Sequence, residues 1–276
     1  MAATPLASLL KRDRIIVVAS LAIITLLAWF YLWTLASQMN GSDSHSVQSG
    51  SSMQDMPGMA MPAMMPGFSR WTLSHAASQF AMWAVMMVGM MTPSVAPVVL
   101  IYARVADQAA RQEKEFAPPM WFLIGYLLVW TLFALLATAT QWGLERAALL
   151  TPMLVGANHY FGGGLLLLAG LYQWSPLKEV CLVHCRSPIA FVQAHGGFKA
   201  GIRGSILLGA RHGAYCLGCC WMLMALLFVA GVMNLAWIAA IMVLVLLEKI
   251  APYGRWIAKL AGGGALVAGA WMIAAG

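Results

Sequence analysis

The residues from His212 to Met224 carry the most chemistry in this chain. One imidazole and three thiols fall in that run: His212, Cys216, Cys219 and Cys220. Each residue of an α-helix turns about 100° around the helix axis, so these four side chains would share roughly a quarter of one helix face. Imidazole and thiolate groups are ligands of soft and borderline metal ions. The stretch therefore predicts one wall of a metal site, at the mouth of an apolar run.

A second cluster lies earlier in the chain and has the same skeleton. Residues 181–185 read Cys-Leu-Val-His-Cys and residues 216–220 read Cys-Leu-Gly-Cys-Cys, and together they contain all five cysteines. A lone buried cysteine usually behaves as a small hydrophobic residue, but two similar clusters beside histidines favour metal binding. Ligands on one helix leave half of the coordination sphere open, so we expect the earlier cluster to complete the site through Cys181, His184 and Cys185.

The composition restricts the class of protein that can hold such a site. Hydrophobic residues make up 62% of the 276 residues and charged residues only 9%, which is typical of a polytopic membrane protein and excludes a water-soluble enzyme. The net charge of +7 is spread as single basic residues between apolar runs. That spread fits a topology signal better than a phosphate-binding patch, so we expect no nucleic-acid partner.

The apolar runs predict an all-α fold of about seven transmembrane helices. Of the 16 Lys and Arg residues, only Arg70 and Arg146 fall in connections that this topology puts outside. Because basic residues concentrate on the cytoplasmic side, the N-terminus is predicted to be cytoplasmic and the C-terminus to lie outside. The predicted spans are Ile15–Ala36, Ser74–Tyr102, Pro119–Trp142, Tyr160–Trp174, Gly213–Val232, Leu235–Leu247 and Leu260–Ala275.

Three regions follow from this pattern. Residues 1–36 would form an uncleaved anchor helix, residues 37–74 a methionine-rich outer loop, and residues 75–276 a six-helix membrane domain with the Cys/His site. The loop has no apolar core of its own and is predicted to be disordered. A thioether sulfur is a soft ligand that favours Cu(I). Copper capture is therefore predicted for the loop residues Met56, Met59, Met61, Met64 and Met65.

The second predicted span continues the methionine pattern. Its residues form two series with i, i+4 spacing, which stacks sulfurs along neighbouring sectors of a helix: Met82, Met86 and Met90, and Met87 and Met91. Packing against lipid or in a core explains such methionines equally well, so a metal pathway stays one of two interpretations. Pro93 and Pro97 lie in the same span and are expected to kink it.

The donor set favours copper. Four of the Cys and His ligands could form a tetrahedral zinc site, but zinc does not account for the methionines, whereas Cu(I) binds both thioether and thiolate sulfur. Glu248, next to Lys249 at the inner end of the sixth span, is a candidate acidic partner of the site, since an acidic residue at that depth is usually functional or paired. A structural pair of Glu248 with Lys249 or Arg255 is the alternative.

Several of these motifs together resemble a bacterial family of predicted metal-binding integral membrane proteins of unknown function. The resemblance covers about residues 70–275. It rests on Met-Met-Thr-Pro at residues 90–93, the cluster at 181–185, Arg-His-Gly at 211–213 followed by the cluster at 216–220 and Trp221, and the Glu-Lys pair at 248–249. It implies a helical fold in the bacterial inner membrane and a bound metal. The methionine-rich loop and helix also resemble Ctr-type copper transporters, which we interpret as convergent chemistry.

Three functional hypotheses remain at this point. The first is a copper-handling membrane protein that captures Cu(I) outside and passes it to the cytoplasmic-side Cys/His site, for uptake or for delivery to a copper chaperone or copper-enzyme subunit. The second is a metal-dependent redox enzyme or monooxygenase-associated subunit, in which Cys216 at a helix start would have a lowered pKa. The third is a structural subunit whose metal staples helices together.

Overall fold

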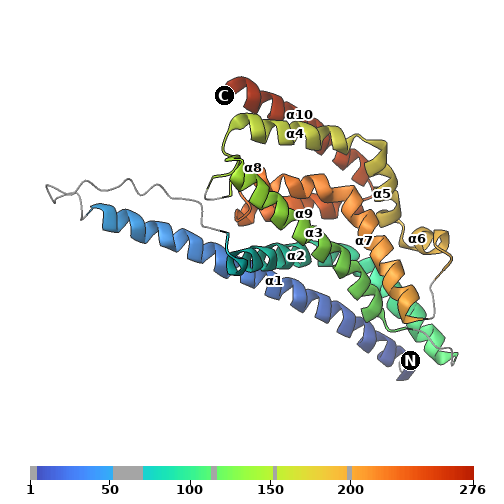
Figure 1. The fold of residues 1–276 in the computed structure, drawn as a ribbon. Coiled ribbons are helices and arrows are strands. Elements are labelled where there is room, and N and C mark those ends of the chain that lie inside the picture. The colour runs from blue at the N-terminus through green and yellow to red at the C-terminus, as the bar shows by residue number, and fades with distance from the viewer. Residues whose placement is uncertain (1–4, 52–70, 113–116, 152–153, 198–200) are drawn as a thin grey trace.

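The computed structural model describes residues 5–51, 71–112, 117–151, 154–197 and 201–276 (Figure 1). Those residues form helices and no β-strand, which confirms the predicted all-α class. The helices are α1 (Pro5–Ser51), α2 (Leu73–Arg111), α3 (Pro119–Arg146), α4 (His159–Gln173), α5 (Pro176–Arg186), α6 (Pro188–Ala194), α7 (Ile202–Ala225), α8 (Leu227–Ala230), α9 (Leu235–Ile250) and α10 (Gly254–Ala275).

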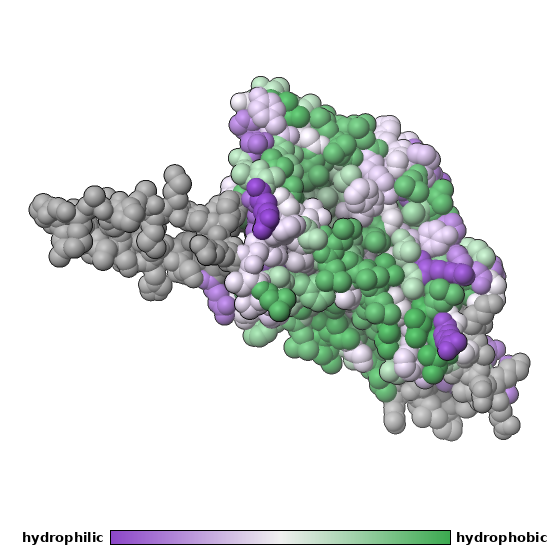
Figure 2. Space-filling view, viewed as in Figure 1, coloured by the Kyte–Doolittle hydropathy of each residue, from purple (hydrophilic) through white to green (hydrophobic). Residues whose placement is uncertain are grey.

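Five of the described segments are long and apolar enough to cross a membrane: Ile15–Gln38, Leu73–Ala109, Pro119–Arg146, Ile202–Ala230 and Gly254–Ala275. Helices α4 and α9 correspond to the predicted fourth and sixth spans but have only 15 and 16 residues, fewer than the roughly 20 that a straight crossing needs. Length and composition therefore support five spans and do not establish seven. Figure 2 shows hydrophobic side chains over much of the visible helical surface, with hydrophilic residues mainly toward its ends.

The region predicted as a cytoplasmic loop is helical. Ser175 caps α5 by accepting a hydrogen bond from the Lys178 amide, and Pro176 occupies the first helical turn, where a missing N–H costs nothing. Residues 181–185 therefore sit on a helix. The next helix, α7, begins at Ile202 and not at the expected Gly213. Cys216 consequently lies well inside α7, and its expected position at a helix start was wrong.

The first helix also differs from its predicted extent. It continues past Ala36 to Ser51, so part of the segment expected to be disordered is helical. The loop methionines from Met56 to Met65 lie outside the described residues, and their predicted copper capture stays a prediction.

Close helix contacts through glycine hold α7 and its neighbours together. A Cβ on Gly209 would lie 2.0 Å from the Phe122 carbonyl oxygen, and a Cβ on Gly125 would lie 2.0 Å from the Ile206 carbonyl oxygen. Small residues at such positions let membrane helices approach closely. The contact brings α3 against the face of α7 that carries the cysteines. Glycines join α4 and α10 in the same way, since a Cβ on Gly163 would lie 2.9 Å from the Gly269 carbonyl oxygen.

Candidate metal centre

Three cysteines of α7 form the centre of the site. Cys216, Cys219 and Cys220 are each 1% exposed, on the same buried face as His212. The thiols of Cys219 and Cys220 both donate to the Cys216 carbonyl oxygen, at 3.0 Å. These contacts direct the three sulfurs inward from one face of the helix, as the spacing predicted.

Helix α5 supplies a fourth thiol. Cys185 is within hydrogen-bonding reach of the sulfurs of Cys216 and Cys219, and these hydrogen bonds, with burial, hold the pKa of the Cys185 thiol well above its usual range. The two similar sequence clusters thus meet at Cys185. We call Cys185, Cys216, Cys219 and Cys220 the cysteine cluster.

Cys181 lies one turn before Cys185 and packs on the surface of α7. A Cβ placed on Gly218 would come within 2.7 Å of the Cys181 sulfur, so the absence of a side chain at Gly218 makes the room for this contact. Burial raises the pKa of the Cys181 thiol. Cys181 is therefore a neighbour of the cysteine cluster through Cys219.

Lys249 of α9 inserts into the cysteine cluster. Its Nζ lies 2.9 Å from the Cys216 sulfur and 3.3 Å from the Ser94 hydroxyl. The electrostatic partners of this ammonium are the four sulfurs of the cluster, and Lys249 itself is only 7% exposed. The sequence alone indicates a topology signal or a partner of Glu248 at Lys249, and neither interpretation includes its contact with sulfur.

Helices α2 and α3 complete the surroundings of Cys216. The Tyr126 hydroxyl lies 3.1 Å from the Cys216 sulfur and donates to the Met91 carbonyl oxygen at 3.1 Å. The Ser94 hydroxyl donates to the same carbonyl at 2.9 Å. The C-terminal end of the methionine series therefore lies beside the cysteine cluster.

Glu248 points to a different neighbour from Lys249. Its carboxylate forms an ion pair with Lys178 at 2.6 Å and accepts a hydrogen bond from Gln173 at 2.8 Å. The expected structural pairs of Glu248 with Lys249 or Arg255 were wrong, since Arg255 pairs with Glu179. Successive residues of a helix point about 100° apart, which lets Glu248 and Lys249 serve separate networks.

The buried ion pair fixes α5 in place. Lys178 is 1% exposed and occurs three and seven residues before Cys181 and Cys185, a spacing that puts all three on one helix face. Unpaired buried charges are costly, so the Lys178–Glu248 contact anchors that face against α9. Glu248 thereby positions the cysteines of α5. The partners of its carboxylate are Lys178 and Gln173, whereas Lys249 donates directly to a thiol sulfur.

The two histidines of the predicted site have different surroundings. His212 is 2% exposed, packs against Phe122, Tyr126 and Phe191, and its Nδ1 has no hydrogen-bond partner. His184 stacks on Tyr215 with ring centroids 4.3 Å apart, and its Nδ1 donates to the Val180 carbonyl. His212 thus lines the cluster with a free ring nitrogen, whereas His184 packs beside it.

The methionines of α2 face the protein interior. Met82, Met86, Met87, Met90 and Met91 are between 0% and 4% exposed; we call them the methionine stripe. Packing against lipid, one of the two explanations of these methionines that involve no metal, therefore does not apply to them. At 1.5 Å per residue the stripe covers about 14 Å of helix length, roughly half the thickness of a bilayer core.

Comparison with known proteins assigns the chain to a family. Residues 80–272 match PpoB2, a family described as copper chaperone, and this match covers the methionine stripe, both cysteine motifs and Lys249. The chain belongs to the PpoB2 family. No curated protein and no solved structure matched. The PpoB2 match supports a copper-related role and agrees with the expected metal at this level.

The donors of this PpoB2 member suit copper. Thiolate and thioether sulfur select Cu(I), and the buried Nδ1 of His212 adds an unpartnered nitrogen. Among the described residues, no three side chains of His, Cys, Asp or Glu are arranged to hold a metal ion together. In the described geometry the sulfurs instead engage Lys249, Tyr126 and the Cys216 carbonyl, so metal binding requires these thiols to exchange their present partners.

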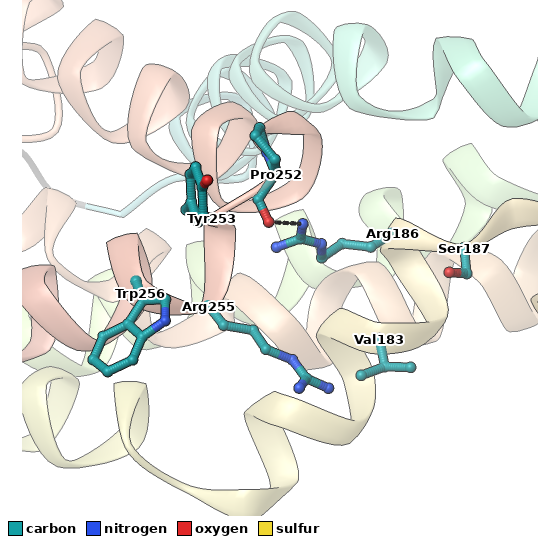
Figure 3. A pocket seen from close by; sticks show the side chains of 7 residues that line it. All are labelled: Val183, Arg186, Ser187, Pro252, Tyr253, Arg255 and Trp256. Atoms are coloured by element: carbon teal, nitrogen blue, oxygen red, sulfur yellow. Dashed lines mark hydrogen bonds between the residues drawn. The ribbon is translucent and has the colours of Figure 1, made fainter.

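A cavity of about 420 Å³ lies on the other side of α5 (Figure 3). Its lining contains Arg186, whose guanidinium donates to the carbonyls of Ala251 and Pro252 at 2.7 and 3.0 Å. No cysteine, methionine or histidine lines it. Arg186 therefore ties α5 to the turn between α9 and α10, a second support for the position of the cysteines.

Proposed function

We propose that this PpoB2-family protein is a membrane copper chaperone that moves Cu(I) along the methionine stripe to the cysteine cluster and releases it on the cytoplasmic side. The observation that carries the proposal is the junction at Cys216. There the hydroxyls of Tyr126 and Ser94 each contact both the Met91 carbonyl oxygen, at the end of the stripe, and the Cys216 sulfur. Neutral thioethers bind Cu(I) weakly and thiolates bind it tightly, so affinity rises toward the cluster.

The orientation follows from the basic residues. We infer that α4 and α9 also cross the membrane, tilted or at a locally thinner bilayer, which gives seven crossings with the N-terminus in the cytoplasm. Arg211 lies five residues before Cys216 on α7, so the cluster would be about 7 Å deeper than that basic residue. The ion would then leave through the end of the bundle that carries α5, toward a cytoplasmic copper protein.

The two alternative functions, a redox enzyme and a structural subunit, have less support. The redox-enzyme hypothesis rested on a Cys216 at a helix start, whereas Cys216 lies well inside α7. For a stapling metal, the helices around the cluster are already joined by the Lys178–Glu248 ion pair and by the glycine contact between α3 and α7. Neither alternative assigns a role to the buried methionines, the last of which, Met91, shares the Tyr126 hydroxyl with Cys216.

The test is transfer across a membrane. The purified protein is reconstituted in liposomes that contain a Cu(I)-specific fluorescent chelator, with Cu(I) supplied outside under anaerobic conditions. We expect chelator signal with wild-type protein, none with a Cys216→Ser/Cys219→Ser variant, and wild-type signal with Met272→Leu, a methionine on α10 outside the stripe. Equal signal from the cysteine variant and the wild type would contradict the proposal.

A further inference from the structure

The position of Lys249 raises a question that copper binding alone does not answer. Its ammonium donates to the Cys216 sulfur, and its electrostatic partners are four cysteine sulfurs. Among the described residues, no carboxylate forms an ion pair with it. A site that only collects cations would gain nothing from a fixed positive charge inside it, since like charges repel.

The neighbouring residue keeps that positive charge available to the sulfurs. Glu248 is the nearest acidic side chain in the sequence, but Lys178 and Gln173 occupy its carboxylate oxygens. A buried ammonium is costly unless it has a partner of opposite charge. The thiolates of the cysteine cluster are the partners that the described geometry offers to Lys249.

The charge of the metal complex decides which ion fits beside a fixed ammonium. A monovalent ion held by two thiolates carries a net charge of −1, which one lysine balances. A divalent ion held by the same two thiolates is neutral and leaves the lysine charge unbalanced in a buried site. A zinc site normally takes four ligands, and among the described residues no group of three His, Cys, Asp or Glu side chains is preorganised.

We propose that Lys249 is a specificity-determining residue: it makes the cysteine cluster selective for a monovalent soft ion bound by two thiolates and discriminates against divalent ions such as Zn²⁺. This inference rests on the proposed function, because it assumes that the cluster binds Cu(I). Lys249 need not touch the ion, and it acts by balancing the charge of the sulfurs that do. Cys216, whose sulfur lies 2.9 Å from the ammonium, is expected to be one of the two ligands, with Lys249 moving from direct contact to a position beside the complex.

The experiment compares the wild-type protein with four full-length variants in detergent. Lys249→Met removes the charge at similar side-chain volume, and Lys249→Arg keeps it. Lys259→Met is the matched control, because Lys259 lies on α10 over the Trp256 ring and away from the cluster. The affinities for Cu(I) and for Zn²⁺ are measured separately at one pH by competition with chromophoric chelators.

We expect Lys249→Met to weaken Cu(I) binding by about tenfold or more, the loss typical of a charge-assisted contact, and to strengthen Zn²⁺ binding relative to Cu(I). Lys249→Arg and Lys259→Met should keep the wild-type ratio. Lys249→Gln provides a second neutral variant, so that the comparison does not depend on the folding of one protein. X-ray absorption at the copper edge should give two sulfur neighbours for wild type.

The outcomes separate the two proposals. A wild-type protein that binds no Cu(I) would overturn the proposed function and this inference with it. The inference alone would be overturned if the wild-type protein binds Cu(I) and the folded Lys249→Met and Lys249→Gln proteins keep the wild-type ratio of Cu(I) affinity to Zn²⁺ affinity.

Discussion

The methionine stripe and the cysteine cluster are both groups of soft sulfur atoms, yet their surroundings differ. The stripe spreads five neutral thioethers along one helix, whereas the cluster gathers four thiols from α5 and α7 around the ammonium of Lys249. A neutral donor in a row holds an ion weakly at several positions, and a charged donor set holds it tightly at one. Under the proposed function, this difference assigns passage of the ion to the stripe and its retention to the cluster.

The difference between the methionine stripe and the cysteine cluster depends most on the cysteines. Replacing Cys216 and Cys219 with serine should weaken equilibrium Cu(I) binding by more than about 100-fold, since even outer-shell partners of a metal site contribute about 10–100-fold and a hydroxyl is a poor ligand for Cu(I). Anaerobic competition with a chromophoric chelator measures the loss. Cys181→Ser is the control and should lose less, because Cys181 neighbours the cluster without belonging to it. If Cys181→Ser lost as much Cu(I) affinity as the variant without Cys216 and Cys219, Cys181 would have to be counted in the cluster.

The position of α5 depends on its buried ion pair. Glu248→Gln leaves Lys178 charged and unpaired and should lower the free energy of unfolding by about 3 kcal/mol. Glu179→Gln is the matched control, because its pair with Arg255 is half exposed and should contribute less than about 1 kcal/mol. Thermal unfolding in detergent compares them. If both variants unfold at the same temperature, the ion pair does not anchor the cysteine-bearing face of α5.

The stripe should affect rate and leave affinity unchanged. Changing Met86 and Met90 to leucine removes two sulfurs at similar volume, and a rise of about 1.4 kcal/mol in the transfer barrier would slow liposomal transfer about tenfold. Equilibrium Cu(I) binding should stay at the wild-type value, as should both quantities in Met272→Leu. A loss of affinity instead would make the stripe part of the retention site.

The smallest effect is expected from the outer methionine loop. Deleting residues 53–65 should lower copper accumulation by cells when copper is scarce and have no effect when copper is abundant, because weak thioether ligands act only as collectors. Growth of a copper-dependent strain over a range of copper concentrations measures this. Wild-type behaviour at every concentration would leave the loop as a spacer.

The sequence predicted the cysteine-bearing face of α7 because helix spacing alone determines it. The open coordination sphere of α7 predicted that the earlier cluster would approach it through Cys181, His184 and Cys185, and of these it is Cys185 that comes within hydrogen-bonding reach of Cys216 and Cys219. The helical state of α5 was missed, although Ser175-Pro176 and the spacing of Lys178, Cys181 and Cys185 are a helix start and an amphipathic face. The role of Lys249 could not be predicted, because its contacts with Ser94 and Cys216 join residues far apart in the chain.

The central claim is that thiols from α5 and α7 hold one Cu(I) ion together. A double-mutant cycle with Cys185→Ser and Cys216→Ser tests it most directly, with Cu(I) affinity measured for the wild type, both single variants and the double variant. Two ligands of one site should give large single losses and a double loss well below their sum. Losses that add, or full affinity in Cys185→Ser, would contradict a shared site.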